Sequence, residues 1–195
     1  PSSTTLQIPT QGIGEWCHGT YCPEINDSVF RSLAVGDRFD VEGIPFATPQ
    51  HGKNIAFVSL WDNYPSALTI PVKAQTASVA HILLAGSTNH MQTHMDNAII
   101  IANYKDGTSD TLHLIPPFNY CPIEQDFYVD GKAFQTVEPR PVRICLATGT
   151  VSRNLGTALS INSDEVYGRE IPGGAAQLLS MPLSPSKKLH SFTLI

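Results

Sequence analysis

Two polar loops carry the aromatic, amide and imidazole side chains that are best suited to bind a sugar. One loop follows Leu60 and the other follows Gly86. Aromatic faces can stack on the apolar faces of sugar rings, and amide and imidazole groups each offer a donor and an acceptor to sugar hydroxyls. The predicted ligand-binding residues are Trp61, Asn63, Tyr64, Asn89, His90 and Gln92. The alternative interpretation places Trp61 in the core and treats Asp62 and Asn63 as ordinary turn residues.

The second loop also contains residue types that bind metals. His90 and His94 are four residues apart, a spacing that on a helix would put both imidazoles on one face, as a zinc site requires. Asp96 follows them, but no glutamate follows His90, and the segment lies between strands. The alternative is a polar loop whose histidines bond to the backbone, and we predict no metal site here.

Glu124 and Asp126 are the remaining acidic pair with a chemical interpretation. Two such carboxylates can bind calcium or act as acid and base in glycoside hydrolysis. Because no second acidic cluster accompanies them, we expect a solvated or turn-stabilising role. No nucleophile elbow is present either, so we predict no catalytic residue and no cofactor. A structural calcium ion held by backbone carbonyls stays open, because such ligands leave no mark in a sequence.

Short apolar runs separated by turn residues must position these loops. Asp106-Gly107 is the strongest hairpin signal and joins two of the runs. The segment 98–102 is apolar without alternation, which predicts a central strand covered on both faces. Asp130-Gly131 repeats the hairpin signal between the segments 127–129 and 132–137. The other predicted strands are 38–42, 43–46, 55–61, 66–72, 78–86, 98–105, 109–114, 140–146, 155–161, 175–181 and 189–195.

Helical periodicity is nearly absent from the chain. The best helix candidate is 26–33, of one or two turns, with Asp27 or Ser28 as its cap. Pro71 and Pro141 are expected at strand ends or edges. Short strands at regular spacing, without long helices between them, predict an all-β fold: an antiparallel β-sandwich of jelly-roll type. We expect one domain, 1–195, on which an irregular N-terminal segment, 1–35, packs.

Charge and hydropathy argue against several classes of partner. The 195-residue chain has a net charge of -5, and its basic residues are scattered. No basic stripe exists, so nucleic-acid binding is not predicted. No apolar run approaches the roughly 20 residues that span a bilayer, so membrane insertion is not predicted. Pro1 is not a natural translation start, and we therefore expect the chain to come from a longer precursor.

The four cysteines leave the redox state open. Cys17 and Cys22 could close a small disulfide loop, although reduced thiols or pairing with Cys121 are alternatives. Cys145 lies in an apolar run and is expected to be a small core residue. Cysteine usage therefore does not fix the compartment.

Four long phrases of the sequence carry a resemblance to a known family. They are 53–65, 83–108, 122–128 and 173–189. They resemble the C-terminal β-sandwich region of a family of large, uncharacterised bacterial proteins from polysaccharide-utilisation systems. In that family the sandwich accompanies a helical-toroid, glycoside-hydrolase-like domain. The sandwich itself resembles the galactose-binding-like and glycosidase-associated carbohydrate-binding modules. The resemblance implies a periplasmic or secreted location and a glycan context, and it supplies no catalytic residue.

We therefore predict a non-catalytic carbohydrate-binding or accessory domain of a glycan-degrading protein. Its expected partners are carbohydrate and the catalytic domain of the parent protein. The alternatives are a purely structural interdomain support domain without its own ligand and a small glycoside hydrolase. A binding module exposes aromatic residues in a groove, and a support domain exposes an apolar patch. A hydrolase needs two carboxyl groups about 5–10 Å apart across a cleft.

Overall fold

The protein is an antiparallel all-β sandwich, as the strand pattern predicts. The computed structural model describes residues 4–5, 7–8, 24–49, 52–60, 64–88, 92–127, 129, 131–161 and 170–195. Within these residues every ladder between named strands is antiparallel. None of the described helices is long or apolar enough to cross a bilayer.

The outer sheet has four strands. In spatial order they are β5 (Leu68–Gln75), β12 (Leu189–Leu194), β7 (Ala98–Tyr104) and β8 (Ser109–Leu114). β7 and β8 form the hairpin predicted from Asp106-Gly107. Gly107 adopts a φ of 84°, and Asp106 Oδ1 accepts a hydrogen bond from the Thr108 N–H at 3.0 Å, which is an Asx-turn. Pro71 lies on the edge strand β5, as expected.

The middle sheet packs against one face of the outer sheet. Its strands are, in order, β10 (Val151–Ser152), β9 (Val142–Cys145), β11 (Ala175–Pro182) and β6 (Val79–Leu84). Alternate residues of β11 and β7 meet between the sheets, including Leu179, Met181, Ile100 and Ala102. Burial of these side chains is the main stabilising contribution of the sandwich core. Pro141 directly precedes β9, at a strand end as expected.

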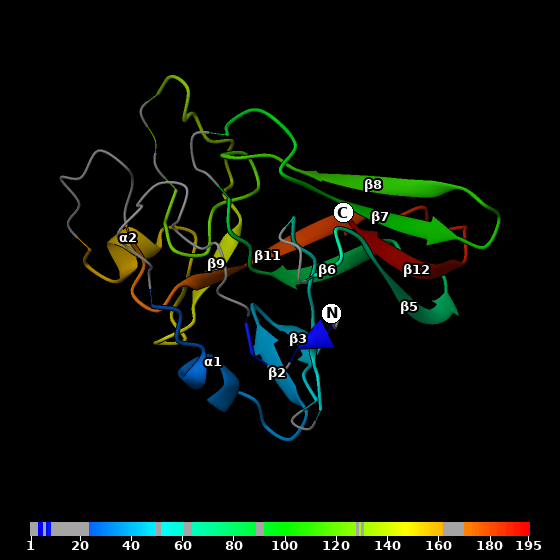
Figure 1. Ribbon diagram of the computed structural model, residues 1–195, viewed down its shortest axis with the longest axis horizontal. Helices are drawn as coiled ribbons and strands as arrows, with labels where there is room; N and C mark the ends of the chain where they lie inside the picture. The colour runs from blue at the N-terminus through cyan, green and yellow to red at the C-terminus, as the bar shows by residue number, and fades with distance from the viewer. Residues whose placement is uncertain are drawn as a thin grey trace.

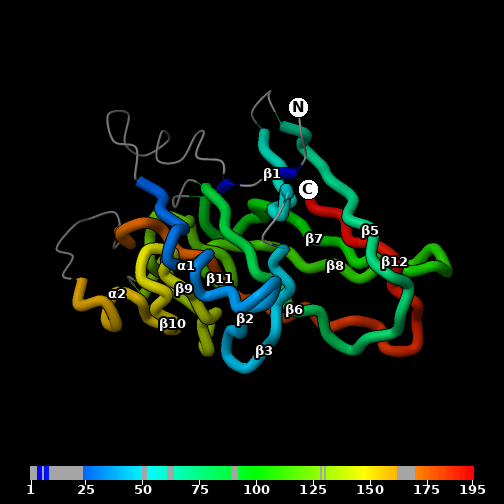
Figure 2. Tube along the Cα trace, turned by 90° about the horizontal axis from the view of Figure 1, so that it is seen from below, coloured from blue at the N-terminus to red at the C-terminus, as the bar shows by residue number. Residues whose placement is uncertain are grey.

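A third layer covers the other face of the middle sheet. It consists of α1 (Ser28–Ser32) and the hairpin of β2 (Arg38–Val41) and β3 (Ile44–Ala47). Phe39 and Val41 pack there on Val142, Ile144 and Leu178. Figure 1 shows this layer below the middle sheet, with β7 and β8 above it, and Figure 2 shows it from below, in front of β9 and β11. The helix falls within the predicted segment 26–33.

Two of the predicted strands have other structures. The segment 155–161 begins as a helix, α2 (Leu155–Ala158). The Asn154 side chain caps it by accepting from the Thr157 N–H at 3.0 Å, and such a cap outweighs the apolar pattern. Of 55–60, the part of the predicted strand 55–61 that the structure describes, only β4 (Ile55–Ala56) is a strand, paired with β1 (Thr4–Thr5). Phe57 packs on Tyr64 instead of extending the ladder.

The second hairpin prediction is also wrong for the part of it that the structure describes. Phe127, Val129 and residues 131–137 form no strand, while Tyr128 and Asp130 lie outside the described residues. Short patterns of this kind occur in turns as well as in strands. β7 is central in its sheet, as predicted, but only one of its faces is fully covered, because Ile99 and Ile101 stay partly exposed.

Candidate functional site

Two loops enter the outer sheet at the same end. The segment 57–67 leads into β5, and 85–97 leads into β7. Because β5 and β7 both pair antiparallel with β12, they begin at the same end of the sheet, about 10 Å apart with one strand between them. The backbone of Ile195 exchanges hydrogen bonds of 2.9 and 3.0 Å with Ile99, so Ile195 lies between the loops. We call this end of the sheet the rim.

The predicted sugar-binding residues divide into those that the structure describes and those that it does not. Trp61, Asn63, Asn89 and His90 lie outside the described residues. Tyr64 is half-buried and packs edge-on against Phe57, with 4.6 Å between ring centroids. Gln92 is exposed. The structure therefore places Tyr64 and Gln92 on two loops of one rim.

A hydrogen-bonded network holds the loop that carries Gln92. The Thr88 hydroxyl contacts Gln92 Oε1 at 3.3 Å and also Asn97 Oδ1. Asn97 Nδ2 donates to the backbone oxygens of Gln92 and Met95, each at 3.1 Å. No described residue accepts a hydrogen bond from Gln92 Nε2. The network fixes the amide of Gln92 while its Nε2 faces solvent, which is the arrangement that a preorganised polar contact needs.

Two histidine contacts hold the same loop, one to Phe118 and one to β8 of the outer sheet. His94, with a φ of 58°, stacks on Phe118 at 4.9 Å between ring centroids. Asp96 Oδ2 lies 2.9 Å from His113 Nδ1 on β8, and both side chains are about half exposed. His94 and Asp96, which were considered as metal ligands together with His90, thus contact different partners. Within the part of the chain that the structure describes, no three His, Cys, Asp or Glu side chains gather as a metal site would require.

Large apolar side chains are exposed on both rim loops and at the chain end between them. Leu60 is 95% exposed, Met95 52% and Ile195 49%. Apolar groups of this kind, set beside amides and an imidazole–carboxylate pair, can contact both the C–H faces and the hydroxyls of a sugar. The same exposed groups would also suit contact with a neighbouring domain.

The acidic pair that the sequence singles out lies inside the molecule. Residues 120–127 are all buried: Tyr120 belongs to the core between the sheets, and Ile123 packs on Leu146 and Ala176. Glu124 is only 5% exposed and Asp126 only 3%. The expected solvated role of these carboxylates is therefore wrong, and two side chains buried in this way do not face each other across an open cleft.

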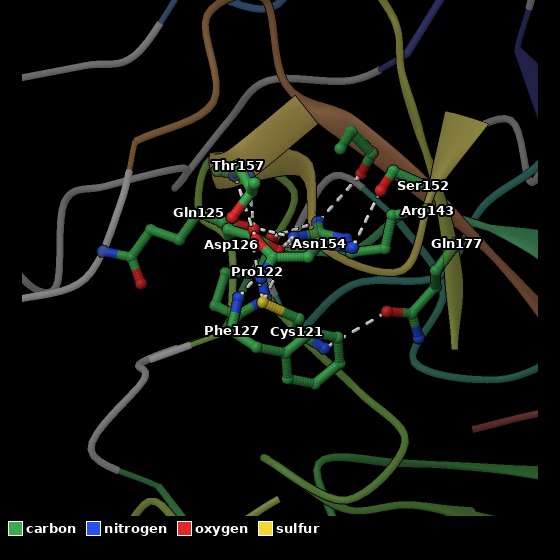
Figure 3. A network of polar contacts seen from close by, with 12 residues as sticks. Cys121, Pro122, Gln125, Asp126, Phe127, Arg143, Ser152, Asn154, Thr157 and Gln177 are labelled. Carbon is green, nitrogen blue, oxygen red and sulfur yellow. Dashed lines mark hydrogen bonds and ion pairs between the residues drawn. The ribbon is translucent and has the colours of Figure 1, made fainter. Parts of the chain in front are cut away.

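Arg143 organises this internal cluster (Figure 3). It is fully buried on β9, and its guanidinium donates to the backbone oxygens of Pro122 at 2.8 Å, of Ala175 at 3.3 Å and of Gln125. The carboxylate of Asp126 lies 3.7 Å away. A buried charge needs such partners, because an unpaired one costs several kcal/mol.

Asp126 links the cluster to helix α2. Its Oδ2 accepts from the Gly156 N–H at 2.7 Å, in the first turn of the helix, and its Oδ1 accepts from the Phe127 N–H at 2.9 Å. The carboxylate thereby satisfies one of the donors that a helix start leaves unpaired. Asp126 therefore has the turn-stabilising role that was one of the two expectations from the sequence, but it performs this role in the interior of the protein.

Glu124 and Cys121 have altered acidity in the same cluster. Burial raises the pKa of Glu124 to about 7 and that of the Cys121 thiol to about 12. No described residue hydrogen-bonds to Glu124 Oε2. The Cys121 thiol is not in a disulfide and donates to the backbone oxygen of Gln125 at 3.3 Å. Cys145 is fully buried and free, as expected of a core residue, while Cys17 and Cys22 lie outside the described residues.

Sequence reasoning missed two features of these sites. Arg143 interrupts an apolar run, and a lone arginine in a buried strand is a signal for an internal ion pair. His113 occupies an outward position of β8 and was not connected with Asp96, because nothing in the sequence shows that residues 17 positions apart meet across a loop.

Comparison with family models, with curated proteins and with solved structures finds no match to this chain.

Proposed function

We propose that this protein is a non-catalytic carbohydrate-binding or accessory domain that belongs to a glycan-degrading protein of the periplasm or the extracellular space. The observation that supports this most is the rim itself. Two loops rich in aromatic, amide and imidazole groups enter the same end of one sheet. Function concentrates on loops that a rigid sandwich positions in this way.

The chemistry of the rim suits a neutral, hydroxyl-rich ligand. The Thr88–Gln92–Asn97 network presents amide groups of fixed orientation, and Leu60 and Met95 supply apolar surface. Catalysis is not part of the proposal, because the buried carboxylates serve the internal cluster. Weak binding is expected for such a site, since a few hydrogen bonds and one or two stacked rings carry it.

A glycan array of plant and host polysaccharides, followed by isothermal titration calorimetry, tests this function. Saturable binding that falls in Tyr64→Ala, Gln92→Ala or Trp61→Ala supports it. Lys105→Ala is the matched control, because Lys105 is exposed at the opposite end of the outer sheet, beyond β7. If the wild-type domain binds none of the polysaccharides, the proposal is wrong.

A purely structural support domain is the second candidate function. It is favoured by apolar side chains on α1 and just after it, where Leu33 is 43% and Val35 87% exposed. Val35→Lys should leave the stability of the isolated domain within about 0.5 kcal/mol. The same change should lower the melting temperature of a longer protein in which this surface is covered. Equal melting temperatures of the longer protein and its variant would contradict the support role.

A further inference from the structure

The outer face of the outer sheet is a second surface with binding chemistry. Side chains of β7 alternate, so that Ile100 and Ala102 enter the core whereas Ile101 and Asn103 face away from it. The strand register places four of these outward residues side by side in one row, in the order Thr69, Thr193, Ile101 and Thr111. This row crosses all four strands, a span of about 14 Å.

A hydrogen-bonded array follows the row. Asn103 Nδ2 donates to Thr193 Oγ1 at 3.0 Å and to Ser191 Oγ at 3.3 Å, and the hydroxyls of Thr193 and Thr69 lie 3.2 Å apart. No described residue donates a hydrogen bond to Asn103 Oδ1. These contacts restrict the polar side chains to one geometry before any ligand arrives, which lowers the entropy cost of binding.

The array is continuous with the rim. His113 lies two residues along β8 from Thr111 and is paired with Asp96 of the rim loop at 2.9 Å. Ile99, two residues from Ile101 on β7, pairs with Ile195 at the rim. A ligand that extends beyond the rim loops at this corner therefore meets the row next.

We propose that this row is the track on which a neutral polysaccharide chain lies, continuing from the rim across β8, β7, β12 and β5. This inference rests on the proposed carbohydrate function and extends it from a terminal sugar to a chain of several sugars. The side chains of the row are uncharged, so an anionic polymer has no cation to pair with among them. The three threonine hydroxyls and the aliphatic side chain of Ile101 suit contact with both the hydroxyl and the C–H groups of a sugar chain.

The composition of the row favours a glycan over a protein partner. The centre of a stable protein interface is apolar and rich in aromatic anchors. Here the centre of the face holds hydroxyls and an amide, and its apolar members are isoleucines that are only partly exposed. A protein partner would have to desolvate these polar groups, whereas sugar hydroxyls replace their water contacts with hydrogen bonds.

The test measures affinity for galactomannan, arabinoxylan and mixed-linkage β-glucan by affinity electrophoresis and calorimetry, with homogalacturonan as the anionic comparison. Asn103→Ala and Thr193→Val should weaken binding of the recognised neutral polysaccharide about tenfold each. Binding of its short oligosaccharides at the rim should change less than twofold. Thr111→Val is a third row variant, and it should fold normally. Thr111 is exposed on an edge strand, and valine suits a strand.

Ser180→Ala is the matched control. It removes another exposed cross-strand hydroxyl, which lies 3.1 Å from His81 Nδ1 on the middle sheet and away from the row. Its affinity should equal that of the wild type. Polysaccharide binding that is lost in Tyr64→Ala or Trp61→Ala but unchanged in all three row variants would overturn the track and leave the proposed function intact. Failure of the wild type to bind any of these polymers, or any on the glycan array, would overturn both.

Discussion

The sandwich contains two polar networks, one around Arg143 in the interior and one around Asn103 on the surface of the outer sheet. Around Arg143, the residues of the network are buried and most of their polar atoms bond to other atoms of the protein, although Arg143 Nε and Glu124 Oε2 have no partner among the described residues. Around Asn103, the array lies on the outer face of the outer sheet, where Ser191 is buried but Thr69 is exposed, and no described residue donates to the amide oxygen of Asn103. In the low dielectric of the interior a lost partner is costly, whereas at the surface water or a ligand replaces it. The internal network therefore holds the fold, and the surface array is available for binding.

Removal of the buried guanidinium should have the largest effect on stability. Arg143→Ala leaves Asp126 as a buried carboxylate without its cation and frees several backbone oxygens, so the unfolding free energy should fall by about 3–5 kcal/mol. Urea denaturation followed by circular dichroism measures this. Arg140→Ala is the control, because Arg140 forms its 2.9 Å ion pair with Glu138 at the surface, where such pairs contribute little. Equal losses of unfolding free energy in the two variants would show that the buried position of Arg143 adds nothing to its contribution.

Glu124 should make stability fall as pH rises, a consequence of its burial. Its pKa is about 7 in the folded protein against an ordinary value of 4.5. Between these values the folded state holds more protons than the unfolded state, so the unfolding free energy decreases from about pH 4.5 to pH 7. Glu124→Gln removes this dependence. Relative to the wild type, the variant should gain up to about 3 kcal/mol between pH 5 and pH 8.

Urea denaturation of both proteins at the two pH values checks the prediction. Glu138→Gln is the matched control, because hydrogen bonds to Arg140 lower the pKa of the Glu138 carboxyl, so its titration is complete below pH 5. A parallel pH dependence in wild type and Glu124→Gln would show that the buried carboxyl is not the group responsible.

Gly86 lies between the rim loop and the internal cluster around Arg143. Its substitution should lower the unfolding free energy by an intermediate amount. It follows β6 at the start of the rim loop, and a Cβ added there would overlap the Tyr120 hydroxyl. Tyr120 is buried beside the internal cluster, so neither group can move freely. Gly86→Ala should cost about 1–3 kcal/mol, measured by thermal unfolding. Gly43→Ala is the comparison, because nothing lies near its added Cβ and only its φ of 76° opposes the change. A smaller loss of stability in Gly86→Ala than in Gly43→Ala would show that the Tyr120 side chain moves to make room for the added Cβ.

The sequence predicts the parts of this fold that depend on regular alternation. The hairpin at Asp106-Gly107 and the strands β11 and β12 follow from periodicity and turn chemistry, which act locally. The segment 155–161 was predicted wrongly because its helix depends on Asn154 and on Asp126, a residue about 30 positions away. Burial of Asp126 was equally invisible, since its ion pair is with Arg143 on β9, 17 positions away along the chain. Local pattern thus predicted the sheets, and long-range pairing decided the role of the polar residues.

The smallest expected effect is the most informative for the surface array. Thr111→Val replaces an exposed hydroxyl on an edge strand with a β-branched residue, so the unfolding free energy should change by no more than about 0.5 kcal/mol. Urea denaturation under the conditions used for Arg143→Ala measures it. A loss of more than about 1 kcal/mol would mean that the row of outward side chains supports the sheet, as the internal network supports the interior. If stability is unchanged, any loss of polysaccharide affinity in this variant must come from the ligand contact itself, because the sheet that presents the hydroxyl is intact.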